Sequence, residues 1–127
     1  MLIAIDFSSE TPIYAQIRDQ IIIGAAGKAL TPGEALPSVR RMAADIGVNV
    51  NTVNKAYTIL KEEGYITIDR RSGCFISTKT PPVDEAFSSE LRARLMPIAA
   101  SAACRHMGAE TFESFCKKIY EDVEVQP

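Results

Sequence analysis

Apolar residues three and four positions apart organise the first part of the chain. Isoleucines recur at this spacing from Ile13 to Ile21, with polar residues between them, and predict a helix over about 12–26. Thr11 is expected to cap this helix, because a threonine hydroxyl accepts a hydrogen bond from a free amide of the first turn. Pro12 is then its first residue, where a missing amide donor costs nothing.

A helix-turn-helix is predicted next. A turn-rich connection over 30–37 leads to Ser38, which is expected to cap a second helix that ends at Gly47. After a turn of about three residues, a third helix is predicted over about 51–63. Two helices joined by so short a turn have the arrangement of a DNA-binding helix-turn-helix. Val53 supplies an apolar residue beneath the second helix of this motif.

A β-hairpin with a basic tip follows the third helix. Large and polar residues alternate over 65–69, and residues 74–77 return as a second strand. Arg70, Arg71 and Gly73 lie in the turn, where they suit an adjacent minor groove or phosphates. The predicted fold class is mainly α with a small β-hairpin: an N-terminal winged helix-turn-helix followed by a C-terminal helical dimerisation tail.

Two amphipathic helices are predicted in the C-terminal part. Residues 78–82 are expected to form a linker between a DNA-binding domain over 1–77 and a tail over 83–127. Pro97 is expected to kink or interrupt the first tail helix, and Gly108 to end it. Two such helices can hardly cover each other's apolar faces, so we expect a homodimer. The residues assigned to the dimer face are Phe87, Leu91, Leu95, Ile98, Phe112, Phe115, Ile119 and Tyr120.

The net charge of −2 and the isoelectric point near 5.4 oppose a nucleic-acid partner when the chain is taken as a whole. The distribution of charge changes this picture. Residues 1–80 hold nine lysines and arginines against eight acidic residues, whereas 81–127 hold five against eight. Because the acidic excess lies in the tail, double-stranded DNA stays a reasonable partner for the N-terminal domain.

Other classes of function find little support. No stretch approaches the ~20 apolar residues of a membrane span and no signal peptide is evident, so a cytoplasmic protein without a membrane partner is expected. Cys74, Cys104 and Cys116 lack metal-ligand spacing and are expected to be buried reduced thiols, without metal or cofactor. The sole histidine, His106, has Cys104 only two residues away, on a different side of a helix, so an enzyme is not expected.

Polar residues at the start of the third helix are the candidates for reading bases, because this motif presents that end to the major groove. Two interpretations of Asn51 stay open, a helix cap or a base contact. Arg40 and Arg41 begin the second helix, and we expect one to contact a phosphate and the other to be solvated. The full set of candidate DNA contacts is Ser38, Arg40, Arg41, Asn49, Asn51, Thr52, Asn54, Lys55, Arg70, Arg71 and Gly73.

The chain carries, in order, PIYAQI (12–17), LPSVR (36–40), GVNVNTV (47–53), AY (56–57) and EGYI (63–66), followed by Gly73 and Phe75. In sequence and spacing these segments resemble the GntR family of bacterial regulators over about residues 10–77, and the short tail resembles that of the YtrA-type subfamily. The resemblance implies a homodimer that binds a partly palindromic operator, usually as a repressor released by a small-molecule effector, often at membrane transporter genes.

The resemblance also bears on single residues. It places Arg40, Thr52 and Gly73 among the DNA contacts. Many members have arginine where this chain has Val50, so the neighbouring asparagines are expected to carry more of the base reading. The alternative function is a winged helix that binds protein, since a fold does not fix a function. The acidic isoelectric point mildly favours that alternative, whereas the basic hairpin tip opposes it.

Overall fold

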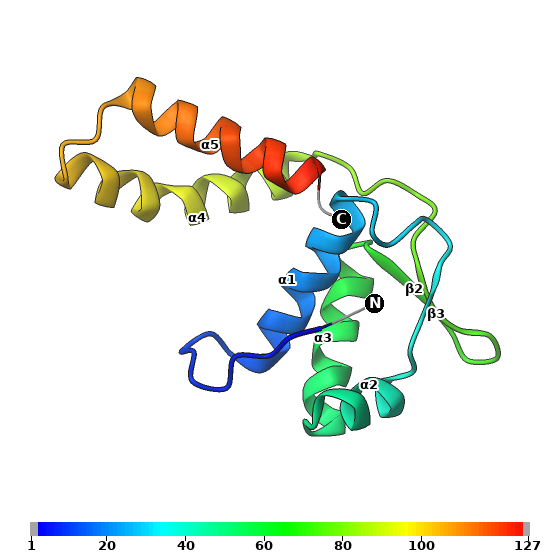
Figure 1. Cartoon of the computed structure of the whole chain (residues 1–127). Coiled ribbons are helices and arrows are strands. Elements are labelled where there is room, and N and C mark those ends of the chain that lie inside the picture. The colour runs from blue at the N-terminus through cyan, green and yellow to red at the C-terminus, as the bar shows by residue number, and fades with distance from the viewer. Residues whose placement is uncertain (1–2, 126–127) are drawn as a thin grey trace. The chain divides into compact units, whose positions relative to one another are not determined.

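The computed structural model describes residues 3–125, which form two compact units, one over 3–81 and the other over 82–125. The first unit holds three helices and a small antiparallel sheet (Figure 1). Among residues 3–125, every helix is too short or too polar to span a bilayer. The elements of the first unit are α1 (Ile13–Ala26), β1 (Ala35–Leu36), α2 (Val39–Ile46), α3 (Val50–Glu62), β2 (Ile66–Asp69) and β3 (Gly73–Ile76).

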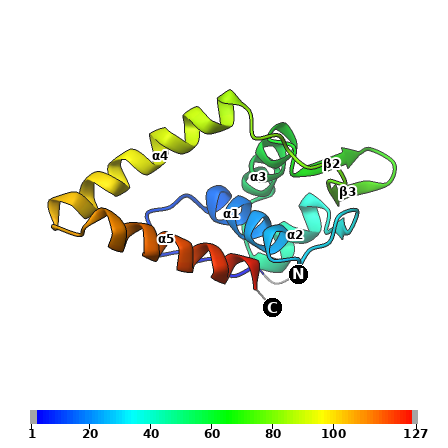
Figure 2. The ribbon, with the colours of Figure 1, turned by 90° about the horizontal axis from the view of Figure 1, so that it is seen from above.

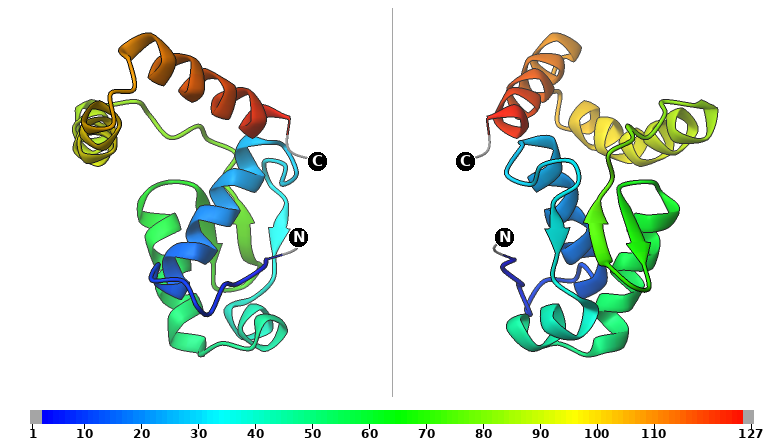
Figure 3. Two further views of the ribbon diagram at one scale, coloured as in Figure 1. Left: turned by 60° about the vertical axis from the view of Figure 1, so that its left-hand side comes forward. Right: turned by 90° about the vertical axis from the view of Figure 1, so that its right-hand side faces the viewer.

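The core of the first unit lies between α1, α3 and the sheet. Each helix contributes two completely buried residues, Ile17 and Ile21 from α1 and Tyr57 and Leu60 from α3. The sheet contributes Ile66 to the same core. α1 and α3 pack along each other, and α2 packs against α3 (Figure 3). This packing fixes one face of α3 on the unit and leaves the opposite face exposed to solvent.

The sheet has the strand order β1-β3-β2, and both pairs are antiparallel. The predicted hairpin is confirmed, with Ile66 opposite Ile76. β1 was not predicted, because it lies in the segment interpreted as a turn-rich connection. It forms because the Gly33 amide donates to the Ile76 carbonyl at 2.8 Å and aligns Ala35 with Phe75.

The start of α1 differs from the predicted cap at Thr11. Pro12 occupies the cap position in an extended conformation, with φ −55° and ψ 145°, so the helix begins at Ile13 and has no side-chain cap. The Thr11 carbonyl accepts a hydrogen bond from Gln16 Nε2 at 2.9 Å. The same Nε2 also donates to the Asp6 carbonyl at 3.0 Å. The side chain of Gln16, and not a cap at Thr11, therefore holds the segment before α1 in place through hydrogen bonds.

The second unit consists of α4 (Glu85–Cys104) and α5 (Ala109–Glu124), which form an open V (Figure 2). α4 continues as one helix through Pro97, so of the two outcomes expected there, a kink or an interruption, the interruption does not occur. A proline removes one amide donor and crowds the carbonyl four residues before it, but the hydrogen bonds of the neighbouring turns continue the helix. None of the residues of α4 or α5 is buried within the single chain.

The turn between α4 and α5 corrects the role given to Gly108. α4 ends at Cys104, and the left-handed residue after it is His106, with φ +60°. Gly108 has φ −64° and ψ 156° and stands at the N-cap of α5. The cysteine prediction is correct for Cys74, which is buried, but Cys104 and Cys116 are exposed because their helices pack against so little of the chain.

Candidate nucleic-acid interface

The turn between α2 and α3 is held by contacts at both of its ends. Ser38 caps α2 as predicted, and its Oγ accepts a hydrogen bond from the Arg41 amide at 3.1 Å. Gly47 ends α2 with φ +71° and ψ 39°, a left-handed conformation that glycine adopts without a Cβ penalty. Its amide donates to the Ala43 carbonyl. The backbone conformation at Gly47 therefore sets the direction of α3 relative to α2.

Asn49 caps α3, so of the two interpretations of Asn51 the helix cap is wrong. The Asn49 Oδ1 accepts from the Asn51 amide at 2.7 Å. The Asn49 carbonyl accepts from the amides of Thr52 and Val53 at 3.1 and 3.3 Å, so α3 begins at Val50, one residue earlier than predicted. Asn49 is the residue with the extended backbone of a cap, at φ −68° and ψ 139°. The Asn51 side chain has no part in capping.

Polar side chains follow the exposed face of α3 over its first two turns. Asn51, Asn54 and Lys55 are exposed, and Thr52 is half-buried beside them. The opposite face carries Val53 into the core. Amide groups in this position present a donor and an acceptor together, which is the combination that an adenine edge requires.

Arg40 and Arg41 differ in their surroundings. The Arg41 Nε lies 3.3 Å from the Asp45 carboxylate, one helical turn away, and both side chains are more than half exposed. Within residues 3–125, the side chain of Arg40 makes no ion pair or hydrogen bond. Arg40 thus offers its full charge to an external anion.

Asp69 organises the tip of the hairpin. Its Oδ1 accepts hydrogen bonds from the amides of Arg71 and Ser72 at 2.8 and 3.4 Å. The bond from the Arg71 amide, with a smaller effect from Ser72, holds the pKa of Asp69 below its ordinary value. Gly73 closes the turn at φ +109°, which L-residues rarely adopt. The side chains of Arg70 and Arg71 are exposed on this ordered turn.

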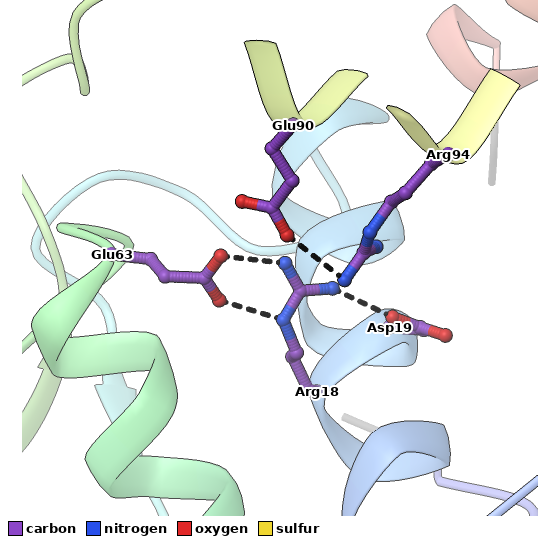
Figure 4. Close-up of polar contacts among 5 residues, drawn as sticks. All are labelled: Arg18, Asp19, Glu63, Glu90 and Arg94. Atoms are coloured by element: carbon purple, nitrogen blue, oxygen red, sulfur yellow. Dashed lines mark hydrogen bonds and ion pairs between the residues drawn. The ribbon is translucent and has the colours of Figure 1, made fainter. Parts of the chain in front are cut away.

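Two internal contacts fasten α3 to the rest of the unit. The Tyr57 hydroxyl donates to the Pro37 carbonyl at 2.7 Å, directly before α2, and burial raises the pKa of this phenol. At the C-terminal end of α3, both oxygens of Glu63 accept from Arg18 of α1, at 2.7 and 2.8 Å (Figure 4). The same guanidinium also donates to Asp19 at 2.8 Å. The carboxylate of Glu63 raises the pKa of Arg18 above its ordinary value.

Most of the candidate residues lie at one end of the first unit. α2 and the first turns of α3 meet at this end, and the tip of the β2–β3 hairpin projects to the side, slightly above them (Figures 1 and 3). Two further residues belong to the same surroundings and were not predicted. Asp69 had a local signal, an aspartate at the start of a Gly-ended turn. Tyr14 of α1, whose ring lies under the Lys55 ammonium at 4.0 Å from Nζ to the ring centroid, had none.

Known proteins resemble this chain in sequence and fold. The model of the bacterial regulatory proteins of the gntR family matches residues 10–76. The HTH-type transcriptional repressor YtrA of Bacillus subtilis is 37% identical over 125 residues, which cover 97% of this chain and 95% of that protein. The uncharacterized HTH-type transcriptional regulator YhcF of the same organism is 44% identical over 79 residues, or 62% of this chain and 65% of its own length.

The similarity extends to a solved structure. The crystal structure of a transcriptional antiterminator from Listeria monocytogenes EGD-e superposes with a TM-score of 0.89 at 28% identity. The superposition covers 98% of this chain and 93% of the Listeria chain. Both the winged helix-turn-helix and the two C-terminal helices therefore have counterparts in a known protein.

Proposed function

Because this chain belongs to the gntR family of bacterial regulatory proteins, we propose that it acts as a homodimeric repressor that binds operator DNA in a sequence-specific way. The observation that carries this proposal is the exposed polar face of α3, in a unit that also presents α2 and a basic hairpin tip. The expected targets include a transporter operon, as the resemblance to the YtrA-type subfamily implies.

Base reading is assigned to α3, placed in the major groove with its first turns toward the base edges. Asn51 and Asn54 are the proposed base contacts, and Thr52 contributes a hydroxyl at the side of the helix. Asn49 has its Oδ1 committed to the cap, so its share in base reading is smaller. The apolar side chain of Val50 is 45% exposed and suits a thymine methyl group.

Phosphate contacts are assigned to the edges of this surface. Arg40 is the principal contact on α2, because Arg41 shares its charge with Asp45. The Ser38 hydroxyl, whose oxygen accepts the capping bond, still has a proton to donate to a phosphate. On the hairpin, Arg70 and Arg71 reach an adjacent minor groove or its phosphates, and the absence of a side chain at Gly73 lets the backbone approach.

The experiment that tests this proposal is operator selection from random duplexes, followed by affinity measurements with single variants. Asn51→Ala and Asn54→Ala are expected to relax the preference at one base pair each per half-site, at a cost of about 1–3 kcal/mol. Arg40→Ala is expected to weaken binding to all sequences alike. Lys61→Ala, an exposed cation in the last turn of α3, is the matched control and should change neither property.

Two outcomes would overturn the assignment. If the alanine variants of Asn51 and Asn54 select the same operator as the unaltered protein, α3 does not read sequence through them. If no duplex gives a salt-dependent mobility shift, the winged helix does not bind DNA and a protein partner becomes the better interpretation.

Dimerisation is assigned to the second unit. Its apolar side chains stay exposed in the single chain, because α4 and α5 diverge from their connecting turn (Figure 2). Phe87, Leu91 and Leu95 on α4 are 41%, 46% and 42% exposed. Ile119 and Tyr120 on α5 are 49% and 68% exposed. Monomeric proteins rarely leave so continuous an apolar surface in water, and a second copy covers it in a closed, symmetric way.

Light scattering tests this assignment by mass. The unaltered protein is expected to have twice the 13.9 kDa mass of one chain at micromolar concentration. Ile119→Glu should give monomers, whereas Lys118→Glu, the neighbouring exposed residue, should leave the dimer intact. Removal of residues 83–127 should leave a folded monomer, since the first unit has its own core. A monomeric full-length protein would contradict the proposal.

A small-molecule effector is part of the proposed repressor cycle. A groove of about 350 Å³ lies along α4, within the size range of small-molecule sites. An occupant would contact residues assigned to the dimer face, so it would act on the association of the two copies. The effector is expected to change the dimer dissociation constant, and a ligand that releases DNA without doing so would contradict this location. The groove is lined by Ser88, Leu91, Arg92, Leu95, Met96 and Ala99.

A further inference from the structure

Lys55 of α3 is exposed, yet its ammonium group has a defined position. Its Nζ lies 4.0 Å from the centroid of the Tyr14 ring, a cation–π contact between the second residue of α1 and the sixth of α3. The ring is half-buried and packs against the core, so it is itself fixed. A lysine that binds an anion from free solution loses rotamer freedom, and here the ring has already restricted it.

The contact lies at the end of the unit that carries the candidate interface. α1 and α3 both begin at this end, beside α2 (Figures 1 and 3). The ion pair from Arg18 of α1 to Glu63 lies at the opposite, C-terminal end of α3. The ring of Tyr14 therefore holds the cation on the side of α3 that faces α1. In a helix lying in the major groove, phosphates flank the sides and base edges form the floor.

We propose that Tyr14 is a positioning residue of the DNA interface, whose ring holds the Lys55 ammonium for contact with a backbone phosphate. The inference rests on the proposed function and deepens it. Lys55 then contributes affinity that does not depend on sequence, and base reading is left to Asn51 and Asn54. In this proposal Tyr14 acts through Lys55, whose ammonium its ring contacts.

A double-mutant cycle in the full-length protein tests this step. The variants are Tyr14→Leu, Lys55→Met and their combination, with Tyr14→Phe as the conservative control that keeps the ring. Tyr14→Leu is expected to weaken binding about two- to five-fold per protomer, equally for the selected operator and an unrelated duplex. In the Lys55→Met background the same change should have no further effect, and Tyr14→Phe should bind like the unaltered protein.

A merely structural role of Tyr14 gives different results. It predicts equal losses from Tyr14→Leu with and without Lys55, and that outcome overturns the inference while leaving DNA binding intact. A loss confined to the selected operator also overturns it. If the unaltered protein binds no duplex at low salt, the proposed function falls, and this inference with it.

Lys55→Met keeps the inference testable even if Tyr14→Leu does not fold, because the side chain of Lys55 is exposed. This variant must lower the slope of log affinity against log salt by about 0.9 per protomer and leave the selected sequence unchanged. An unaltered slope shows that Lys55 does not neutralise a phosphate. The methylene protons beside Nζ should show ring-current shifts that Tyr14→Phe retains, and their absence in the unaltered protein contradicts the contact.

Discussion

Replacing Asn49 with alanine removes the side chain that caps α3. In the folded protein the Asn49 Oδ1 accepts from the Asn51 amide at 2.7 Å, whereas the Asn49 carbonyl starts the helix through its backbone. Alanine keeps the backbone contribution and loses the side-chain acceptor. The Asn51 amide then has only water as a partner, because it lies in the first turn, where no preceding carbonyl is in place.

The expected loss is about 1 kcal/mol of folding free energy, within the range of about 0.5–2 kcal/mol found for such caps. No packing loss adds to it, because the side chain of Asn49 is exposed. For a domain of this size, 1 kcal/mol corresponds to a fall of roughly 4–8 °C in unfolding temperature. Asn51→Ala removes only an exposed side chain of α3, so it should change stability by less than about 0.5 kcal/mol.

Chemical and thermal unfolding of the two variants measure this difference, with Asn49→Ser and Asn49→Asp as controls that keep a capping oxygen. Both controls should stay close to the unaltered protein in stability. Operator selection should show the reverse pattern, with a larger change of preference in Asn51→Ala than in Asn49→Ala. If Asn51→Ala destabilises the protein more than Asn49→Ala does, the assignment of the cap is wrong.

Three further changes are expected to separate structural from DNA-binding roles. Tyr57→Phe loses the hydrogen bond to Pro37 and should cost about 0.5–1.5 kcal/mol in denaturant unfolding without altering the selected operator. Gly47→Ala should cost about 1–2 kcal/mol because of the left-handed backbone, although a Cβ would meet no atom within 4 Å, and Gly47→Asn should be tolerated better. Since the folded-state pKa of Asp69 is lowered, its carboxylate should hold the hairpin tip at pH values above its ordinary 3.8 and lose this role only as pH falls through the lower folded value. The Arg71 amide resonance should therefore titrate below pH 3.8, and a midpoint above that value contradicts the bond.

The elements that the sequence predicts correctly are those with strong local signals. Gly47 ends α2, and the alternation after Gly64 forms the hairpin. Helix ends were harder to place where several residues can take the same role. Asn49 and Asn51 both carry a capping side chain, and the choice between them depends on which residue has an extended backbone. The sequence pattern does not show which of the two asparagines has that backbone.

Contacts between distant residues were missed for a different reason. Arg18 and Glu63 are 45 positions apart, and nothing in either helix marks them as partners. β1 has only two residues and exists because β3 supplies its hydrogen bonds. Hydrophobic periodicity predicts which face of a helix is buried, but it does not predict which residues contact each other across the core. The position of Lys55 on the ring of Tyr14 is a contact of this kind.

The acidic isoelectric point of the whole chain does not oppose DNA binding, because most of the cations that the structure describes near the proposed interface are not paired with carboxylates. Within residues 3–125, four cations near the proposed interface make no ion pair with a carboxylate. In a dimer these cations give up to eight phosphate contacts, so the slope of log affinity against log salt should approach about −7. A slope near −2 would show that most of them lie away from the phosphates and that the interface is assigned to the wrong surface. The four cations are Arg40, Lys55, Arg70 and Arg71.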